Sequence, residues 1–430
     1  MKKRLLVGLL CGAGVSTPIW AQTSVTMYGV LDAGIQVSKF GNGTQTSLAS
    51  GIADGSRLGF KGAEDLGGGY KTIFNLEARI ELDTGANSNG YPVANVGQAL
   101  TNGVSPTVSA ALIGQGVPAA TANATAAAIL AGLNATIGLP PKIVNANNGL
   151  FDRTSMVGLV TPVGAFLLGR QYTPGYEIVA ISDPFERGTA AGWGTITGGT
   201  GDLLTPGVAL RANQTLQYRV QLPSGFGGAA MYGFKDTGSA NVSKRFWGVN
   251  AKYTANGFEA GIGYNTEEDQ LGNKSLTSTV IGGSYTTGPM KFFAGYLRMK
   301  NDHSWLVPQL AATTSFGALA PTIAAIVGEN AKIDGDSYTL GMHYTIGNGR
   351  VMGTVAHTND KLATNADTTL YGLGYDYNMS KRTDLYAIMA HATNENGAQY
   401  GLGGAGYGGG FTSQPGQSAS ALQLGMRHKF

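Results

Sequence analysis

The residues of this chain best placed to do chemistry are three arginines and an acidic link. Arg57, Arg170 and Arg211 stand in or beside segments patterned like strands. The link at 173–212 contains the carboxylates Asp183, Glu186 and Asp202. Opposed fixed cations and anions create a transverse field in a narrow, partly desolvated gap, and this field favours water and hydrated ions over apolar solutes. The pattern indicates electrostatic selection rather than bond making.

Other charged residues are candidates for the same aqueous space. Lys61 lies on the same face of a predicted strand as Arg57, opposite the apolar Leu58. Both bases therefore point to water if the apolar face meets lipid. Arg79 shares its strand face with two glutamates, and Arg153 precedes an apolar segment. The secondary candidates for the lumen are Lys61, Arg79, Arg153 and Asp202.

Catalytic and cofactor motifs are weak in this sequence. GLGGAG from Gly401 matches a dinucleotide fingerprint, but a Gly-rich loop surrounds it and no helix follows. The five histidines have no metal-ligand spacing. A serine hydrolase would need a serine beside His343 or His357 on the predicted strands, and none stands out. We expect neither an enzyme nor a bound cofactor or metal.

The elements that position these residues alternate with a period of two. In the last ten residues the apolar side carries Leu422, Leu424, Met426, His428 and Phe430. The same alternation recurs from Val25 onward in segments of about ten residues, the length that a tilted strand needs to cross a bilayer. One face of each segment suits hydrocarbon and the other suits water. A chain built of such segments is expected to form a transmembrane barrel.

Composition agrees with a barrel that is exported. Charged residues are 13% of the chain, against about 25% in ordinary soluble domains. Residues 1–21 combine a basic start, an apolar stretch that holds the single cysteine, and a plausible cleavage site at Trp20-Ala21, which together predict a signal peptide. Removing its three basic residues from 29 Lys and Arg leaves 26 against 26 Asp and Glu. A mature chain of zero formal charge excludes a bulk basic surface for nucleic acid.

The connections predict the strand number. Seven short turns alternate with eight longer links. The turns lie at 64–69, 161–164, 223–228, 255–257, 288–289, 347–349 and 378–383, and the links include 39–53, 84–150, 173–212 and 301–335. This order gives sixteen antiparallel strands over residues 22–430, with both termini on the short-turn side, as in outer-membrane barrels with short periplasmic turns and long extracellular loops. A sixteen-stranded barrel is wide enough for an aqueous channel. Residues 84–150 would form the long second extracellular loop.

Motifs across nearly the whole mature chain resemble those of one known protein family. They are SVTMYGVLDAGI from Ser24, SRLGFKGAEDLGGGYKTIFNLEA from Ser56, LLGRQY from Leu167, RANQTLQYR from Arg211, SKRTDLYA from Ser380 and the terminal LGMRHKF. The chain resembles the general diffusion porins of the Gram-negative outer membrane, most closely the trimeric beta-proteobacterial type. The resemblance implies a passive homotrimeric channel for small hydrophilic solutes and ions, surrounded by outer-membrane lipid and lipopolysaccharide. It also implies that the barrel-assembly machinery reads Phe430.

In such porins the third long loop folds into the barrel, and its carboxylates face wall arginines across a constriction. Carried over by motif, the arginines are Arg57, Arg170 and Arg211, and the loop acids are Asp183 and Glu186. Here the loop reads DPFERG, with Arg187 directly after Glu186, which changes the local charge balance. Because wall arginines outnumber loop carboxylates, we expect a weak anion preference. The alternatives are a substrate-specific outer-membrane channel and an adhesin acting through its long loops.

Overall fold

The computed structural model describes most of the chain after residue 23. The described ranges are 24–39, 43–87, 108–136, 149–197, 208–234, 245–269, 271–303, 332–403 and 414–430, with isolated positions between 320 and 328 and at 412. The signal peptide predicted at 1–21 lies outside these ranges. So do Asp202 and most of the link at 301–335.

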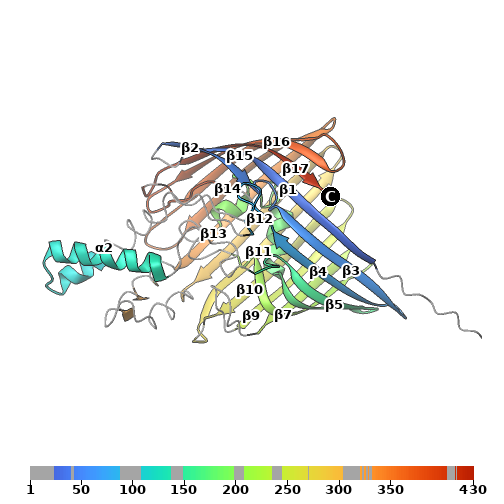
Figure 1. The fold of residues 1–430 in the computed structure, drawn as a ribbon, viewed down its shortest axis with the longest axis horizontal. Coiled ribbons are helices and arrows are strands. Elements are labelled where there is room, and N and C mark those ends of the chain that lie inside the picture. Colours follow the sequence, from blue (N-terminus) through green and yellow to red (C-terminus); the bar gives the residue numbers. More distant parts are fainter. Residues whose placement is uncertain are drawn as a thin grey trace, which may run out of the picture.

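The described strands form one closed antiparallel sheet (Figure 1). The first nine are β1 Ser24–Lys39, β2 Thr44–Ser50, β3 Arg57–Gly67, β4 Tyr70–Arg79, β5 Ser155–Thr161, β6 Gly164–Tyr172, β7 Arg211–Gln221, β8 Phe226–Gly233 and β9 Arg245–Ala255. The others are β10 Phe258–Glu268, β11 Lys274–Thr287, β12 Met290–Asn301, β13 Ile333–Ile346, β14 Gly349–Asp360, β15 Thr368–Asn378, β16 Thr383–Asn394 and β17 Ala419–Lys429.

The barrel closes between β1 and β17. Their register runs from Val30 opposite Lys429 to Lys39 opposite Ser420, and the backbone N–H of Gly29 donates to the carbonyl oxygen of Phe430 at 3.1 Å. Closure removes the unpaired sheet edges that lipid would not tolerate.

The seventeen strand segments amount to sixteen crossings of the wall. β2 and β3 both pair with β1, β2 along its second half and β3 along its first. They form one crossing that is interrupted by a bend at residues 51–56. The prediction of a sixteen-stranded antiparallel barrel is confirmed. The prediction of a link near 39–53 is wrong in detail, because β2 occupies most of it.

Alternation places apolar side chains outside and polar side chains inside. Leu340 and Met389 are more than 60% exposed on the outer face, whereas Gln423 and Thr339 are almost fully buried. The seven short turns lie where they were predicted, at 68–69, 162–163, 222–225, 256–257, 288–289, 347–348 and 379–382. Large apolar groups thus meet hydrocarbon, while polar groups hydrogen-bond to one another and to water inside.

Helices occur only in the long links of the described chain. α2, Ala119–Thr136, belongs to the link at 84–150 and projects well beyond the end of the barrel (Figure 1). Its alanine-rich sequence explains the helix, since alanine has the highest helix propensity. α3 spans Pro174–Ser182, and a 3-10 turn, η1, spans Trp193–Ile196. None of the described helices is both long and apolar enough to cross a membrane.

Candidate functional site

The described part of the link between β6 and β7, residues 173–197 and 208–210, lies inside the barrel, where Figure 1 shows its helical part in green. We call it the inner loop. It begins at Thr173, whose side-chain oxygen accepts a hydrogen bond from the backbone N–H of Tyr176 at 3.3 Å and caps α3. Pro174 occupies the first helical turn, where its missing N–H costs nothing. The local sequence therefore starts a helix directly at the end of β6 and turns the chain inward.

Hydrogen bonds hold the inner loop against the far wall. The indole Nε1 of Trp193 donates to Ser337 Oγ on β13 at 2.8 Å. The backbone N–H of Ala190 donates to Gln423 Oε1 on β17 at 2.8 Å. Both loop residues are completely buried, so these bonds are shielded from competing water. The loop is fixed at several points and is not a free flap.

Glycines on the inner face of the wall make room for the loop. A Cβ added at Gly295 would lie 2.7 Å from Trp193, and one at Gly341 would overlap Pro184. Without a side chain, the wall allows loop atoms to approach its backbone closely. This accounts for part of the high glycine content of the chain. The wall glycines in contact with the loop are Gly248, Gly261, Gly263, Gly282, Gly295, Gly341, Gly372 and Gly374.

The bend between β2 and β3 meets the tip of the loop. The fully buried carboxylate of Asp32 accepts the backbone N–H groups of Ala53 at 3.0 Å and Asp54 at 2.8 Å. On the loop, the N–H of Thr189 donates to the carbonyl of Ile52 at 2.7 Å. The lumen is therefore narrowed from two sides, by the loop and by the bend. The bend was not predicted from the sequence.

The wall formed by β3 to β7 carries both arginines and carboxylates. Two arginines there, Arg57 and Arg79, each form salt bridges with two carboxylates. The contacts are Arg57–Asp54 at 2.7 Å, Arg57–Glu77 at 3.4 Å, Arg79–Asp152 at 3.3 Å and Arg79–Glu81 at 3.4 Å.

Three more arginines in this region contact tyrosines instead. Tyr172 and Tyr176 stack with ring centroids 5.0 Å apart at 10°. The guanidinium carbon of Arg211 lies 4.1 Å from the Tyr172 centroid, and that of Arg187 lies 4.7 Å from the Tyr176 centroid. Arg153 Nη2 donates to the Tyr172 hydroxyl at 3.3 Å. Within the described residues, none of these three arginines is in salt-bridge contact with a carboxylate, and one buried N–H group of each lacks a hydrogen-bond partner.

Asp183 does not face these arginines, contrary to the expectation for a loop acid in the constriction. It ends α3, is completely buried, and accepts the backbone N–H of Phe185 at 2.9 Å. Burial raises the pKa of the Asp183 carboxyl to about 6, although its hydrogen bonds and the charge of Arg187 act in the other direction. Asp183 therefore acts as a hydrogen-bond acceptor within the inner loop.

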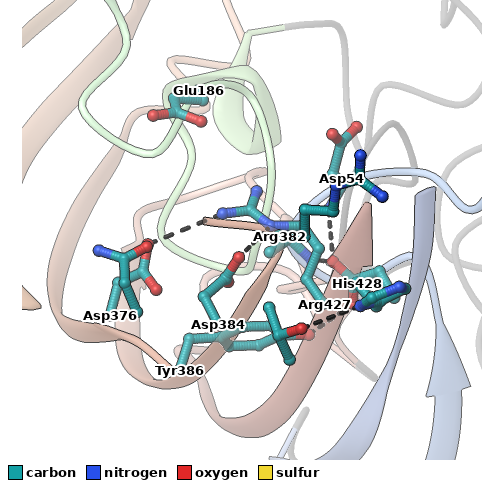
Figure 2. Close-up of polar contacts among 12 residues, drawn as sticks. Asp54, Glu186, Asp376, Arg382, Asp384, Tyr386, Arg427 and His428 are labelled. Carbon is teal, nitrogen blue, oxygen red and sulfur yellow. Dashed lines mark hydrogen bonds and ion pairs between the residues drawn. The ribbon is translucent and has the colours of Figure 1, made fainter. Parts of the chain in front are cut away.

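Glu186 is half-exposed, but it pairs with a different wall. Figure 2 shows it in one view with Asp376, Asp384 and Arg427. Glu186 Oε1 lies 2.9 Å from Nη1 of Arg350 on β14. Arg350 also contacts Asp376 at 3.1 Å, and Arg427 contacts Asp384 at 3.1 Å. Burial alone would raise the pKa of Glu186, but the charge and hydrogen bond of Arg350 lower it. We call this group of five residues the paired cluster, because its ions pair with one another; its three carboxylates and two arginines leave a formal charge of −1.

Glu186 and Arg187 have opposite surroundings although they are adjacent. Their φ angles are 55° and 60°, in the left-handed region that residues other than glycine rarely adopt. This backbone conformation accompanies the turn of Glu186 towards Arg350 and of Arg187 towards Tyr176. The inner loop thus presents a cation, not an anion, to the arginine-rich wall.

The structure places the other predicted residues as follows. Arg170 Nε donates to the backbone carbonyl of Asp152 at 2.6 Å, and its Nη1 bonds to Asn213. The ammonium of Lys61 lies 4.9 Å from the centroid of Tyr28. Arg57, Arg79, Arg153 and Arg211 lie together on the wall of β3 to β7. Neither Asp183 nor Glu186 forms a salt bridge with any of these four arginines in the described structure.

Several residues of the site were not predicted from the sequence. They are Asp54, Tyr172, Tyr176, Arg350, Asp376 and Asp384. Tyr172 stands in the LGRQY motif next to Arg170 and Gln171, but nothing in that motif indicates a stacking partner. In the described ranges, no group of three or more His, Cys, Asp or Glu side chains is placed to hold a metal ion.

Comparisons with known proteins identify relatives over the whole chain. A family model described as Gram-negative porin matches residues 8–398. Outer membrane porin protein 32 of Delftia acidovorans is 26% identical over 442 residues, and an outer membrane porin protein of Bordetella pertussis is 26% identical over 476 residues. Both alignments cover 100% of this chain and of the relative.

Solved structures share the fold. An anion-selective porin from Comamonas acidovorans superposes with a TM-score of 0.67 at 23% identity and covers 95% of this chain and 100% of its own. The trimer form of OmpT, an outer membrane protein of Vibrio cholerae, gives a TM-score of 0.57 at 15% identity over 95% of this chain and 99% of its own. At these identities the likeness concerns the fold alone.

Proposed function

The chain belongs to the Gram-negative porin family, and we propose that this outer-membrane channel passes small hydrophilic solutes and ions through a constriction that favours anions over cations. Porins of this family are passive channels, so the chain is not an enzyme. The proposed constriction lies between the inner loop, the bend at 51–56 and the wall of β3 to β7.

One observation carries the anion preference. Arg153, Arg187 and Arg211 have no carboxylate in salt-bridge contact among the described residues, whereas Arg57 and Arg79 share four carboxylates. Two unit charges about 4 Å apart interact by about 4 kcal/mol at an effective dielectric constant of about 20, against about 1 kcal/mol in bulk water. Unpaired cations in a narrow, partly desolvated gap therefore set the sign of the local potential. The name of the Comamonas relative, an anion-selective porin, agrees with this proposal.

The proposed constriction differs from the one carried over by motif. It keeps Arg57, Arg170 and Arg211 as wall cations and adds Arg153 and Arg187. Glu186 belongs to the paired cluster on the opposite side of the lumen. Asp183 accepts a hydrogen bond within the inner loop and is not part of the constriction. The transverse field then runs from the arginines without carboxylate contacts beside β3 to β7 towards paired ions on β14 to β17.

Reversal potentials in planar bilayers under a KCl gradient test the proposal. The wild-type channel should give stepwise, non-saturating conductance with an anion-selective reversal potential. Replacing Arg153, Arg187 and Arg211 by glutamine should move that potential towards cations. Lys274→Gln, at the exposed start of β11, removes the same unit of charge away from the inner loop and should have little effect. A cation-selective wild type would overturn the proposal, and a saturable current blocked by one solute would indicate a substrate-specific channel.

We further propose a homotrimer whose contacts use the arc from β16 through β1 to β6. Outward tyrosine and tryptophan side chains, which favour membrane interfaces, follow β7 to β15. Over the described part of the arc the outer row is mostly aliphatic, for example Leu48, Met389 and Leu424, and Tyr70 stands at a turn. A solved relative is a trimer. Mass measurement of detergent-solubilised channels, with Leu48→Lys as the disrupting variant, tests this arc.

The same proposal includes two partners. Lipopolysaccharide surrounds the barrel, and the barrel-assembly machinery recognises Phe430. Phe430 forms backbone hydrogen bonds with Gly29 in both directions, and its ring lies over that glycine. Its terminal position and its apolar side chain are what an assembly signal would use before the barrel closes. Deleting Phe430 should lower the yield of assembled channel in the outer membrane more than Phe430→Tyr does.

A further inference from the structure

We propose that Tyr172 and Tyr176 are positioning residues that hold unpaired arginines in the constriction and keep them from pairing with nearby carboxylates. This inference rests on the proposed anion preference and names the residues that maintain it. None of the predicted site residues is a tyrosine, and a tyrosine with a protonated hydroxyl has no charge that could itself select ions.

The two rings join three separate parts of the chain. Tyr172 ends β6, Tyr176 lies in the first turn of α3, Arg211 begins β7, and Arg187 follows the loop tip. The contacts run Arg211 to Tyr172 at 4.1 Å, Tyr172 to Tyr176 at 5.0 Å, and Tyr176 to Arg187 at 4.7 Å. A continuous series of two guanidinium groups and two rings thus connects the wall, the base of the loop and its tip.

Ring contacts hold an arginine without cancelling its charge. A carboxylate partner would neutralise the guanidinium, whereas the face of an aromatic ring attracts it through the ring quadrupole and adds no net charge. The planar guanidinium retains in-plane N–H groups for an anion. One buried N–H group on Arg187 and one on Arg211 have no hydrogen-bond partner among the described residues.

Competing carboxylates lie near enough to matter. Asp54 interacts electrostatically with Arg153, and Glu77 does so with Arg211. Neither pair is in salt-bridge contact, and both carboxylates also contact Arg57. Arginine has a long side chain with many rotamers, so an arginine released from the tyrosine pair would be free to turn towards these acids. The pair therefore determines whether the fixed positive charge faces passing ions or is neutralised.

Substitutions that change no charge test this inference. Tyr172→Leu and Tyr176→Leu should each lower the anion-to-cation permeability ratio by about two- to fivefold, the factor expected for loss of one cation–π contact. Tyr172→Phe keeps the ring below Arg211 but removes the hydroxyl that accepts hydrogen bonds from Arg153 and Arg211, so its ratio should lie between those of the wild type and Tyr172→Leu. Tyr338→Leu, which removes an outward-facing tyrosine of the tilted pair with Tyr296, is the control and should leave the ratio unchanged.

The outcomes separate this inference from the proposed function. If the wild type prefers anions and Arg211→Gln shifts the reversal potential, but both leucine variants keep the wild-type ratio, the tyrosines are only packing residues and the inference is wrong. If the wild type has no anion preference, the proposed function itself fails. Single-channel conductance is recorded alongside, because a purely structural role would change pore size without changing the ion ratio. Should a leucine variant not insert, methionine, which fills irregular gaps, replaces it in the same measurement.

Discussion

Glu186 of the inner loop pairs with Arg350 of β14, with Oε1 and Nη1 2.9 Å apart, and with none of the arginines on β3 to β7 in the described structure. The neighbouring Arg187 faces Tyr176 instead. Two consecutive loop residues thus face different surroundings: Glu186 joins the paired cluster, and Arg187 joins the arginines that contact tyrosines.

Neutralising Glu186 should strengthen anion preference. Glu186→Gln removes a negative charge and leaves Arg350 paired with Asp376. We expect the reversal potential to move further towards anions, with thermal stability changed by no more than about 1 kcal/mol, because exposed ion pairs contribute little. Bilayer recordings and thermal unfolding of the same preparation measure both effects. An unchanged reversal potential would show that Glu186 does not act on permeating ions.

Neutralising Arg187 should have the opposite effect. Arg187→Gln removes both a unit charge that has no carboxylate contact and the guanidinium above Tyr176. The anion-to-cation ratio should fall more than it does in Arg350→Gln, which removes a charge that is already paired. Reversal potentials of the two variants at one salt gradient compare them directly. Equal shifts would contradict the distinction between paired and unpaired arginines.

The wall glycines should control the position of the inner loop. A Cβ at Gly295 would approach Trp193 and Ser182, and both are completely buried loop residues, so Gly295→Ala must displace the loop. We expect altered single-channel conductance and faster proteolysis within the loop. Gly353→Ala is the control, since its nearest neighbour would lie at 4.0 Å. Unchanged conductance in both variants would mean that the loop tolerates the added methyl group.

The stability of the loop should depend on pH through Asp183. Burial raises the pKa of this carboxyl from 3.8 to about 6. Because the folded pKa lies above the unfolded one, the contribution to stability is complete below about pH 4 and is lost as the pH rises through about 6. The change amounts to about 3 kcal/mol for about two pKa units. Urea unfolding at pH 3.5 and pH 8 measures it, and Asp183→Asn should remove most of the difference.

The bend at 51–56 should depend on Asp32. Asp32→Ala removes the acceptor for two backbone N–H groups and for the hydroxyl of Tyr386, which donates at 2.6 Å. Hydrogen bonds to charged groups contribute about 1.5–3 kcal/mol each, so we expect a clear loss of stability together with a change in conductance. Asp32→Asn retains one acceptor oxygen, so its stability should lie between those of the wild type and Asp32→Ala. A fully stable alanine variant would show that other contacts hold the bend.

Much of the barrel could be predicted because its determinant is local. Alternation with a period of two assigns each side chain to one face, and turn residues mark where the chain reverses. This was sufficient for sixteen strands, seven turns and the presence of arginines on the aqueous face. It failed at β2, where the short segment Thr44–Ser50 stands among glycines and polar residues and its pairing with β1 is set by tertiary contacts.

The membrane location of the chain and its wet interior can be read from the amino-acid order, since both follow from the alternation of neighbouring residues. Which charges face one another depends instead on how the folded chain brings distant segments together. Asp183 and Glu186 are three positions apart in a loop without periodicity, and no local rule separates the buried acid from the exposed one. Their surroundings come from strands up to about two hundred residues away in sequence, because charge pairing acts through space and not along the chain.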